Sequence, residues 1–198
     1  MSVAVVNSGG ANISSVLHAL HRLGAEPEFT DDAAAIRAAD RVILPGVGAA
    51  GRAMEVLGEH GLVDTLRKLT QPVLGICLGM QLFFDSSEED DAQLLGIIPG
   101  RLRKLEETAA LRVPHMGWNS ITSQNADRLA DSLNGKWFYF VHSYAAPVNE
   151  WTLSTSQHGS TFSAIVRKDN FYGAQFHPER SAGAGAELLR GFLESPLQ

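Results

Sequence analysis

The chain has 198 residues, of which 44% are hydrophobic and 19% charged, enough to bury one full-sized core and too few for two ordinary domains. Its formal net charge of -6 and the absence of a Lys/Arg cluster argue against nucleic acid and an anionic membrane as partners. Because no run approaches the roughly 18 apolar residues of a membrane span and no basic signal sequence opens the chain, we expect a single cytoplasmic domain over residues 1–198.

The first half of the chain alternates short apolar runs with helical patterns. Residues 3–6 predict a strand, and Asn12 is a suitable N-cap for a helix whose apolar face ends at Gly24. The alternation continues with a short helix in DDAAAIRAAD, a strand in RVILPG, one or two helices in GRAMEVLGEHGLVDTLRKL and a strand in QPVLGIC. Strands that are apolar throughout are typical of a parallel sheet covered on both faces, so these elements predict an α/β fold.

Beyond Gly96 the hydrophobic pattern approaches period two, as in antiparallel ribbons. Polar turns join four strand-like segments, GKWFYFVHSYAAP, EWTLSTSQHG, STFSAIVRKD and NFYGAQFHPE, and a helix over residues 181–194 follows. The acidic run over residues 85–93 is interpreted as a solvated surface loop and not as a metal site. The expected architecture is a mixed, largely parallel central sheet flanked by helices, with an antiparallel extension.

The only cysteine, Cys77, lies in GICLG, between an apolar strand and the apolar segment LGMQLFF, which is expected to form a helix. A single cysteine excludes an internal disulfide and a cysteine-rich metal site, and it is most often a small buried hydrophobic residue. However, G-x-C-x-G at a strand-to-helix junction is typical of a nucleophile elbow, where glycines permit a tight turn. A helix N-terminus also favours the thiolate form. Cys77 is therefore a candidate nucleophile.

A cysteine nucleophile needs a base, and His177 is the best placed of the seven histidines because it directly follows the strand-like run FYGAQF. On an extended backbone His177 and Glu179 point to the same side, so the carboxylate can fix the tautomer of the ring and support an imidazolium. The alternative is a surface His-Pro turn with a solvated glutamate.

Three separated motifs, ILPGVGA, GICLGMQ and QFHPE, together resemble those of the class I glutamine amidotransferases, and the resemblance covers essentially the whole chain. It implies hydrolysis of L-glutamine to glutamate and ammonia through a glutamyl thioester, without a metal or cofactor. Cys77 would be the nucleophile, His177 the base and acid, and Glu179 the residue that orients the ring.

The resemblance also implies the groups around the substrate. The N–H group of Leu78 would donate to the oxyanion, and the second donor would come from PGVG, at Val47 and Gly48, because glycines let this peptide reorient. The amino-acid end of the substrate is assigned to Gln81, His142, Ser143 and Tyr144, and Gly46 is a further substrate-binding residue. From the residues alone, Gln81 could equally be an ordinary helix residue and His142 a strand histidine with satisfied hydrogen bonds.

Four segments narrow the resemblance: NSGGANISSV, PGVGA, VPHMGWN and YFVHSY. They resemble the glutaminase subunits of imidazole glycerol phosphate synthase, which form a heterodimer with a separate (β/α)8-barrel cyclase subunit in histidine biosynthesis. This implies that Asn12, Met116, Trp118 and Asn119 face the cyclase. Because Pro and Gly flank its Met and Trp, PHMGWN is interpreted as a loop. The sequence alone leaves a core position for Met116 and Trp118 equally open. Asn7 stands where many relatives carry an acidic residue.

Three other functions are left open by these patterns. The chain could serve another amidotransferase, such as one for anthranilate, aminodeoxychorismate, carbamoyl phosphate or guanylate, although PHMGWN and YFVHSY are not expected there. It could be a non-catalytic subunit of the same fold, which the intact Cys77, His177 and Glu179 disfavour. It could also be a free-standing cysteine peptidase on γ-glutamyl substrates, which ammonia release that depends on a cyclase would exclude.

Overall fold

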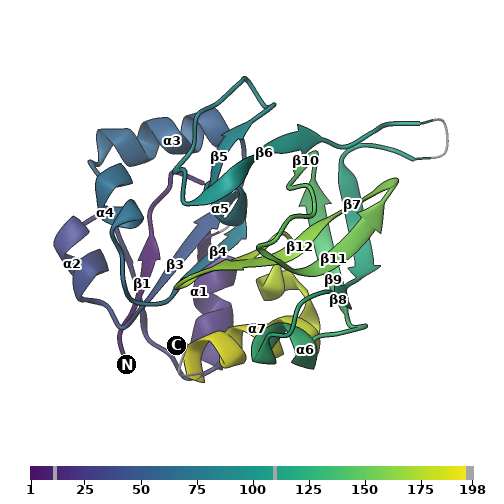
Figure 1. Ribbon diagram of the computed structural model, residues 1–198. Helices are drawn as coiled ribbons and strands as arrows, with labels where there is room; N and C mark the ends of the chain where they lie inside the picture. The colour runs from purple at the N-terminus through teal and green to yellow at the C-terminus, as the bar shows by residue number, and fades with distance from the viewer. Residues whose placement is uncertain (11–12, 109–110, 195–198) are drawn as a thin grey trace.

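The computed structural model describes residues 1–10, 13–108 and 111–194 (Figure 1). In its first half strands alternate with helices, as the apolar runs predict. These elements are β1 (Val3–Val6), α1 (Ile13–Arg22), β2 (Pro27–Thr30), α2 (Ala33–Ala38), β3 (Arg41–Gly46), α3 (Ala50–Glu59), α4 (Val63–Arg67) and β4 (Val73–Cys77). The edge strand β2 escapes prediction because its residues are partly or fully exposed and give no apolar run. The N-cap predicted at Asn12 lies outside the described residues.

The second half is built from shorter and more varied elements. They are α5 (Leu78–Gln81), β5 (Phe84–Ser87), β6 (Ile98–Lys104), β7 (His115–Ser120), β8 (Thr122–Ser123), α6 (Arg128–Ser132), β9 (Trp137–His142), β10 (Tyr144–Ala145), β11 (Thr152–His158), β12 (Ser160–Lys168), β13 (Phe171–Ala174), the 3-10 helix η1 (Pro178–Arg180) and α7 (Ala182–Glu194). The strand-like segments and the closing helix are confirmed. The elements β6, β8 and α6 are additions, since short segments of mixed composition show no clear period.

The helix expected in LGMQLFF is wrong beyond its first turn. Only α5 is helical, and the chain enters β5 at Phe84, so the segment interpreted as the loop 85–93 begins with a strand. Phe83 and Phe84 are fully buried, and β5 pairs in parallel with β6. An apolar run this short supplies core side chains equally well as helix or strand, and tertiary packing decides between the two.

The interpretation of PHMGWN as a loop is also wrong. The segment forms β7, a strand of six residues that pairs antiparallel with β9. Its side chains alternate between the interior, as at His115, and the surface, as at Met116. The preceding Pro114 and the internal Gly117, both typical of turns, hide this alternation in the sequence.

The main sheet has eight strands in the order β2-β1-β3-β4-β13-β12-β11-β8. Its strands are parallel from β2 to β13, and β12, β11 and β8 extend it in antiparallel fashion. The predicted fold class is thereby confirmed. The strand β13, grouped with the antiparallel segments from its sequence, pairs in parallel with β4 and antiparallel with β12. It therefore brings the QFHPE segment beside the carboxyl end of β4.

Helices cover both faces of the main sheet (Figure 1). One apolar cluster contains residues of α1, α6 and α7, and a second contains residues of α2, α3 and α4. The fully buried β4 lies between the two clusters, so its carboxyl end is rigidly held. Within the described ranges, no helix is long and apolar enough to cross a membrane.

Candidate active site

A strained turn presents the cysteine. Cys77 ends β4 with φ 52° and ψ -108°, a conformation that residues other than glycine rarely adopt, and α5 begins at the next residue. The flanking glycines allow this turn, because a Cβ atom on Gly79 would lie 1.7 Å from the carbonyl oxygen of Leu44 and one on Gly75 would lie 2.6 Å from the nitrogen of Met80. The tight strand-to-helix turn predicted from G-x-C-x-G is present.

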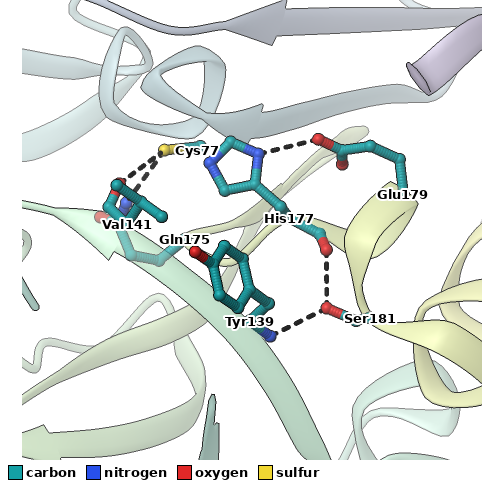
Figure 2. A network of polar contacts seen from close by, with 7 residues as sticks. All are labelled: Cys77, Tyr139, Val141, Gln175, His177, Glu179 and Ser181. Atoms are coloured by element: carbon teal, nitrogen blue, oxygen red, sulfur yellow. Dashed lines mark hydrogen bonds and ion pairs between the residues drawn. The ribbon is translucent and has the colours of Figure 1, made fainter. Parts of the chain in front are cut away.

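The His177 ring lies between Cys77 and Glu179 (Figure 2). Its Nδ1 atom donates to Oε1 of Glu179 at 2.8 Å, and both side chains are almost completely buried. The backbone of His177 is held as well, because its N–H group donates to the carbonyl of Tyr139 at 2.9 Å and its own carbonyl accepts from Ser181 Oγ at 2.6 Å. The solvated His-Pro turn, the alternative for this segment, is therefore excluded.

The surroundings of His177 favour its charged form. Burial alone would lower the pKa of His177, but hydrogen bonds with Cys77 and Glu179, supported by the negative charges of both, raise that pKa to about 10. At neutral pH the ring is therefore an imidazolium. It can stabilise a thiolate on one side while Glu179 compensates the positive charge on the other.

A cavity of about 410 Å³ opens at the carboxyl end of β4. It is lined by most of the residues predicted to bind or polarise a substrate, namely Val47, Gly48, Cys77, Leu78, Gln81, His142, Ser143, Tyr144 and His177. Gly46 is buried and is not among the lining residues. A Cβ atom there would lie 2.9 Å from Cβ of Leu78, so Gly46 lets β3 approach α5.

The cavity wall contains a histidine whose ring nitrogens are both occupied. His142 Nδ1 donates to the carbonyl of Tyr144 at 2.9 Å, and its Nε2 accepts from Nδ1 of His115 at 3.1 Å. Burial lowers the pKa of His142 to about 3, and burial with the nearby His158 lowers that of His115 to about 4. Both rings are therefore neutral at pH 7, and the structure supports the alternative of a satisfied strand histidine for His142.

Four further residues line the cavity that were not predicted as site residues, namely Glu89, Pro114, Val141 and Arg180, although Pro114 and Val141 lie within VPHMGWN and YFVHSY. Glu89 Oε2 accepts from the backbone N–H of Ala50 at 2.8 Å, so this carboxylate turns inward from the acidic run that was interpreted as a solvated surface loop. Arg180 lies with its guanidinium 5.3 Å from the centre of the Tyr139 ring. Its position immediately after HPE is the one sequence signal that could have pointed to it.

Of the four residues predicted to face a partner, two are exposed, Asn119 uses its side chain internally, and Asn12 lies outside the described residues. Met116 and Trp118 are 66% and 50% exposed, which excludes the core alternative for both. The Asn119 amide is used internally, since Nδ2 donates to the carbonyl of Gln157 at 2.8 Å. Asn7 shapes a turn, because its Oδ1 accepts from the Gly9 N–H at 3.1 Å.

The mixed sheet and the Cys77, His177 and Glu179 constellation define the class of protein. A family model described as glutamine amidotransferase class-I matches residues 4–195, and the chain belongs to this family. A solved structure described as a glutamine amidotransferase shares the fold, with a TM-score of 0.75 over 97% of both chains at 20% identity.

Relatives at higher identity define the branch of that family. The imidazole glycerol phosphate synthase subunit HisH of Xylella fastidiosa (strain Temecula1) is 51% identical over 193 residues, which are 97% of this chain and 96% of that protein. HisH of Escherichia coli (strain K12) is 50% identical over 196 residues, 98% of this chain and all of that protein. The chain is therefore a member of the HisH family.

Proposed function

We propose that this chain is the glutaminase subunit of imidazole glycerol phosphate synthase and releases ammonia from L-glutamine for a separate (β/α)8-barrel cyclase subunit in histidine biosynthesis. The observation that carries the proposal is the buried Cys77, His177 and Glu179 arrangement at a cavity, in a chain of the HisH family. A thiolate nucleophile suits a reducing compartment, so we assign the protein to the cytoplasm.

The geometry supports thioester chemistry. The Cys77 sulfur attacks the side-chain amide carbon of glutamine, and the carbonyl electrons move to oxygen to form a tetrahedral oxyanion. In this proposal the Leu78 N–H, directly after the nucleophile, stabilises that charge. The His177 imidazolium gives its proton to the departing ammonia. The neutral ring then takes a proton from water, which hydrolyses the thioester and releases glutamate and the thiolate.

The decisive experiment compares ammonia release from glutamine with and without a purified cyclase subunit and its ribonucleotide substrate. Release should be very slow for the isolated chain and should rise steeply when partner and ribonucleotide are added together. Rapid release without any partner would support a free-standing hydrolase. No release in any combination would contradict the proposal in favour of a non-catalytic subunit.

Glu89 supplies the negative charge that an amino-acid substrate requires at its α-ammonium group. We expect Glu89→Gln to raise KM for glutamine roughly tenfold or more with a smaller effect on kcat, since a hydrogen bond to a charged group is lost while the amide oxygen can still accept from Ala50. Steady-state kinetics with the cyclase present measure this. Glu59→Gln, an exposed change on α3, is the matched control. An unchanged KM would remove Glu89 from the binding site.

The loop after β3 offers a place for control by the partner. Gly48 has φ 99°, a conformation open to glycine, and Val47 and Gly48 both line the cavity. If the Val47 N–H points away in the resting loop, one oxyanion donor is missing and the rate falls by on the order of 10² to 10³. Docking of the cyclase with its nucleotide would favour the loop with this N–H turned inward.

Val47→Pro deletes this N–H group and should abolish the stimulation of ammonia release by the cyclase, while complex formation stays measurable. Val47→Ala keeps the N–H and should remain stimulated. Both variants are compared by ammonia release with and without the cyclase and its ribonucleotide, and by sedimentation of the complex. Full stimulation of Val47→Pro would show that the switch lies elsewhere.

A further inference from the structure

Gln175 is a buried polar residue that the chemistry described above does not use. It directly follows β13, in which Ala174 lies opposite Ile76 of the parallel strand β4, so Gln175 is the neighbour of Cys77. The side chain is fully buried. Its Nε2 atom lies 3.8 Å from Sγ of Cys77, within the range of a hydrogen bond to sulfur (Figure 2). The segment that carries His177 therefore brings a second group to the nucleophile.

The orientation of the Gln175 amide is determined by its neighbour. Gln81 Nε2 donates to the carbonyl oxygen of Tyr144 at 2.8 Å and to Oε1 of Gln175 at 3.1 Å. A backbone carbonyl can only accept, so Gln81 must present its nitrogen at this point. Gln175 must then present its oxygen to Gln81, which leaves its N–H group for Cys77.

The Tyr144 carbonyl is itself fixed by a second donor. His142 Nδ1 donates to it at 2.9 Å, and His142 Nε2 accepts from Nδ1 of His115 at 3.1 Å. The remaining nitrogen of His115 lies 3.4 Å from the amide nitrogen of Asn119. Gln81 Nε2 thus has two acceptors, and Cys77 Sγ also lies 3.6 Å from the carbonyl oxygen of Val141, so each polar group of this network has a partner that fits it. Such satisfied networks hold their members in a single arrangement.

We propose that Gln175 is a positioning residue that donates a hydrogen bond to Cys77 Sγ, holds the sulfur beside His177 and favours the thiolate. The proposal rests on the glutaminase function and deepens it. When the carbon–sulfur bond of the tetrahedral intermediate breaks during thioester hydrolysis, the electron pair returns to sulfur. The same N–H group then meets the returning charge.

The ionisable groups around Cys77 come from several elements, and a substitution at 175 alters none of them. His177 follows β13, while His142, Tyr144, Glu89 and Arg180 line the same cavity. The sole cysteine makes the thiol directly measurable, because alkylation by iodoacetamide followed by intact mass reports on Cys77 alone. The rate of alkylation against pH gives the fraction of Cys77 present as thiolate.

Gln175→Met keeps the length of the side chain and removes the donor. In the isolated chain, without glutamine, we expect the midpoint of its alkylation profile to lie about one pH unit above that of the wild type, since a hydrogen bond to a charged group changes an equilibrium by about tenfold. Gln175→Glu should move the midpoint further in the same direction, because a carboxylate replaces the donor. Gln157→Met, the same change at an exposed position, should leave the profile unchanged.

Equal midpoints for Gln175→Met and the wild type would overturn the proposal, whether or not the wild type hydrolyses glutamine. A wild type that never releases ammonia would overturn the function and leave the alkylation result standing. Should the variants fail to fold by circular dichroism, the side-chain amide signals of Gln175 in wild-type NMR spectra decide the matter. They must move as Cys77 ionises with rising pH, and signals that do not respond exclude the hydrogen bond.

Discussion

Cys77→Ser should abolish glutamine hydrolysis while the fold and the binding of the cyclase are retained. Serine fits the strained turn as cysteine does, but its hydroxyl is a far weaker nucleophile than a thiolate beside an imidazolium. Loss of a nucleophile from a catalytic unit of this kind typically lowers kcat by on the order of 10⁶. Ammonia release in the presence of the cyclase measures the loss, and calorimetric titration measures the complex.

A second measurement separates chemistry from folding. A thiol-directed glutamine analogue should add its mass to the wild-type chain and leave Cys77→Ser unlabelled, since the chain has no other cysteine. Normal turnover by the serine variant would refute the covalent role of Cys77.

His177→Ala should be nearly as damaging as the loss of Cys77, because the members of one catalytic unit are not additive. Glu179→Gln should be impaired less, since the amide oxygen can still accept from Nδ1 of His177. The lost charge is one of the contributions that raise the pKa of His177, so this pKa should fall. The alkaline limb of the pH-rate profile should then move to lower pH, because the imidazolium is lost earlier as pH rises.

The pH-rate profile of the complex measures both variants, and Glu150→Gln, at an exposed position, controls for the change of charge. If Glu179→Gln were as inactive as Cys77→Ser, Glu179 would have a larger role than orienting the ring.

The strands of the parallel sheet were predictable because β1 and β4 are buried and apolar throughout, and β3 is buried after its first residue, Arg41. The edge strand β2 shares their direction and pairing, but it is largely exposed, and nothing in its composition separates it from a loop. The hydrophobic pattern of a segment therefore indicates whether a strand is buried, and it does not detect strands that are exposed.

Where local patterns failed, packing between distant segments decided the structure. The helix that begins LGMQLFF ends with α5, and the chain enters β5 at Phe84 because β6 offers a partner there; PHMGWN becomes a strand because β9 lies opposite. Neither partner can be inferred from the period of the segment itself. Tertiary pairing thus overrides the turn signals of Pro114 and Gly117.

In the candidate site, too, the contacts between residues close in the chain were predictable, and the contacts between distant residues were not. The turn at Cys77 and the His177 to Glu179 pair arise from residues close in the chain, so their sequence motifs indicate them. Gln175 reaches Cys77 across 98 positions, and Glu89 reaches the cavity because its carboxylate caps α3 at Ala50. Both contacts depend on the order of strands and on loop conformation, which no spacing encodes.

Cys77 is the only cysteine and lies beside the His177 imidazolium, and this combination affects how long the protein stays active under oxidation. Thiolates are the forms of cysteine that peroxides oxidise, and the first product is a sulfenic acid. A sulfenic acid at Cys77 would find no second thiol in these 198 residues with which to form a protective disulfide. It must be rescued by a small thiol that enters the cavity, or it proceeds to the irreversible sulfinic acid. Survival of the nucleophile under oxidative stress therefore depends on the surrounding thiol pool and on how well a bound partner or substrate closes the cavity.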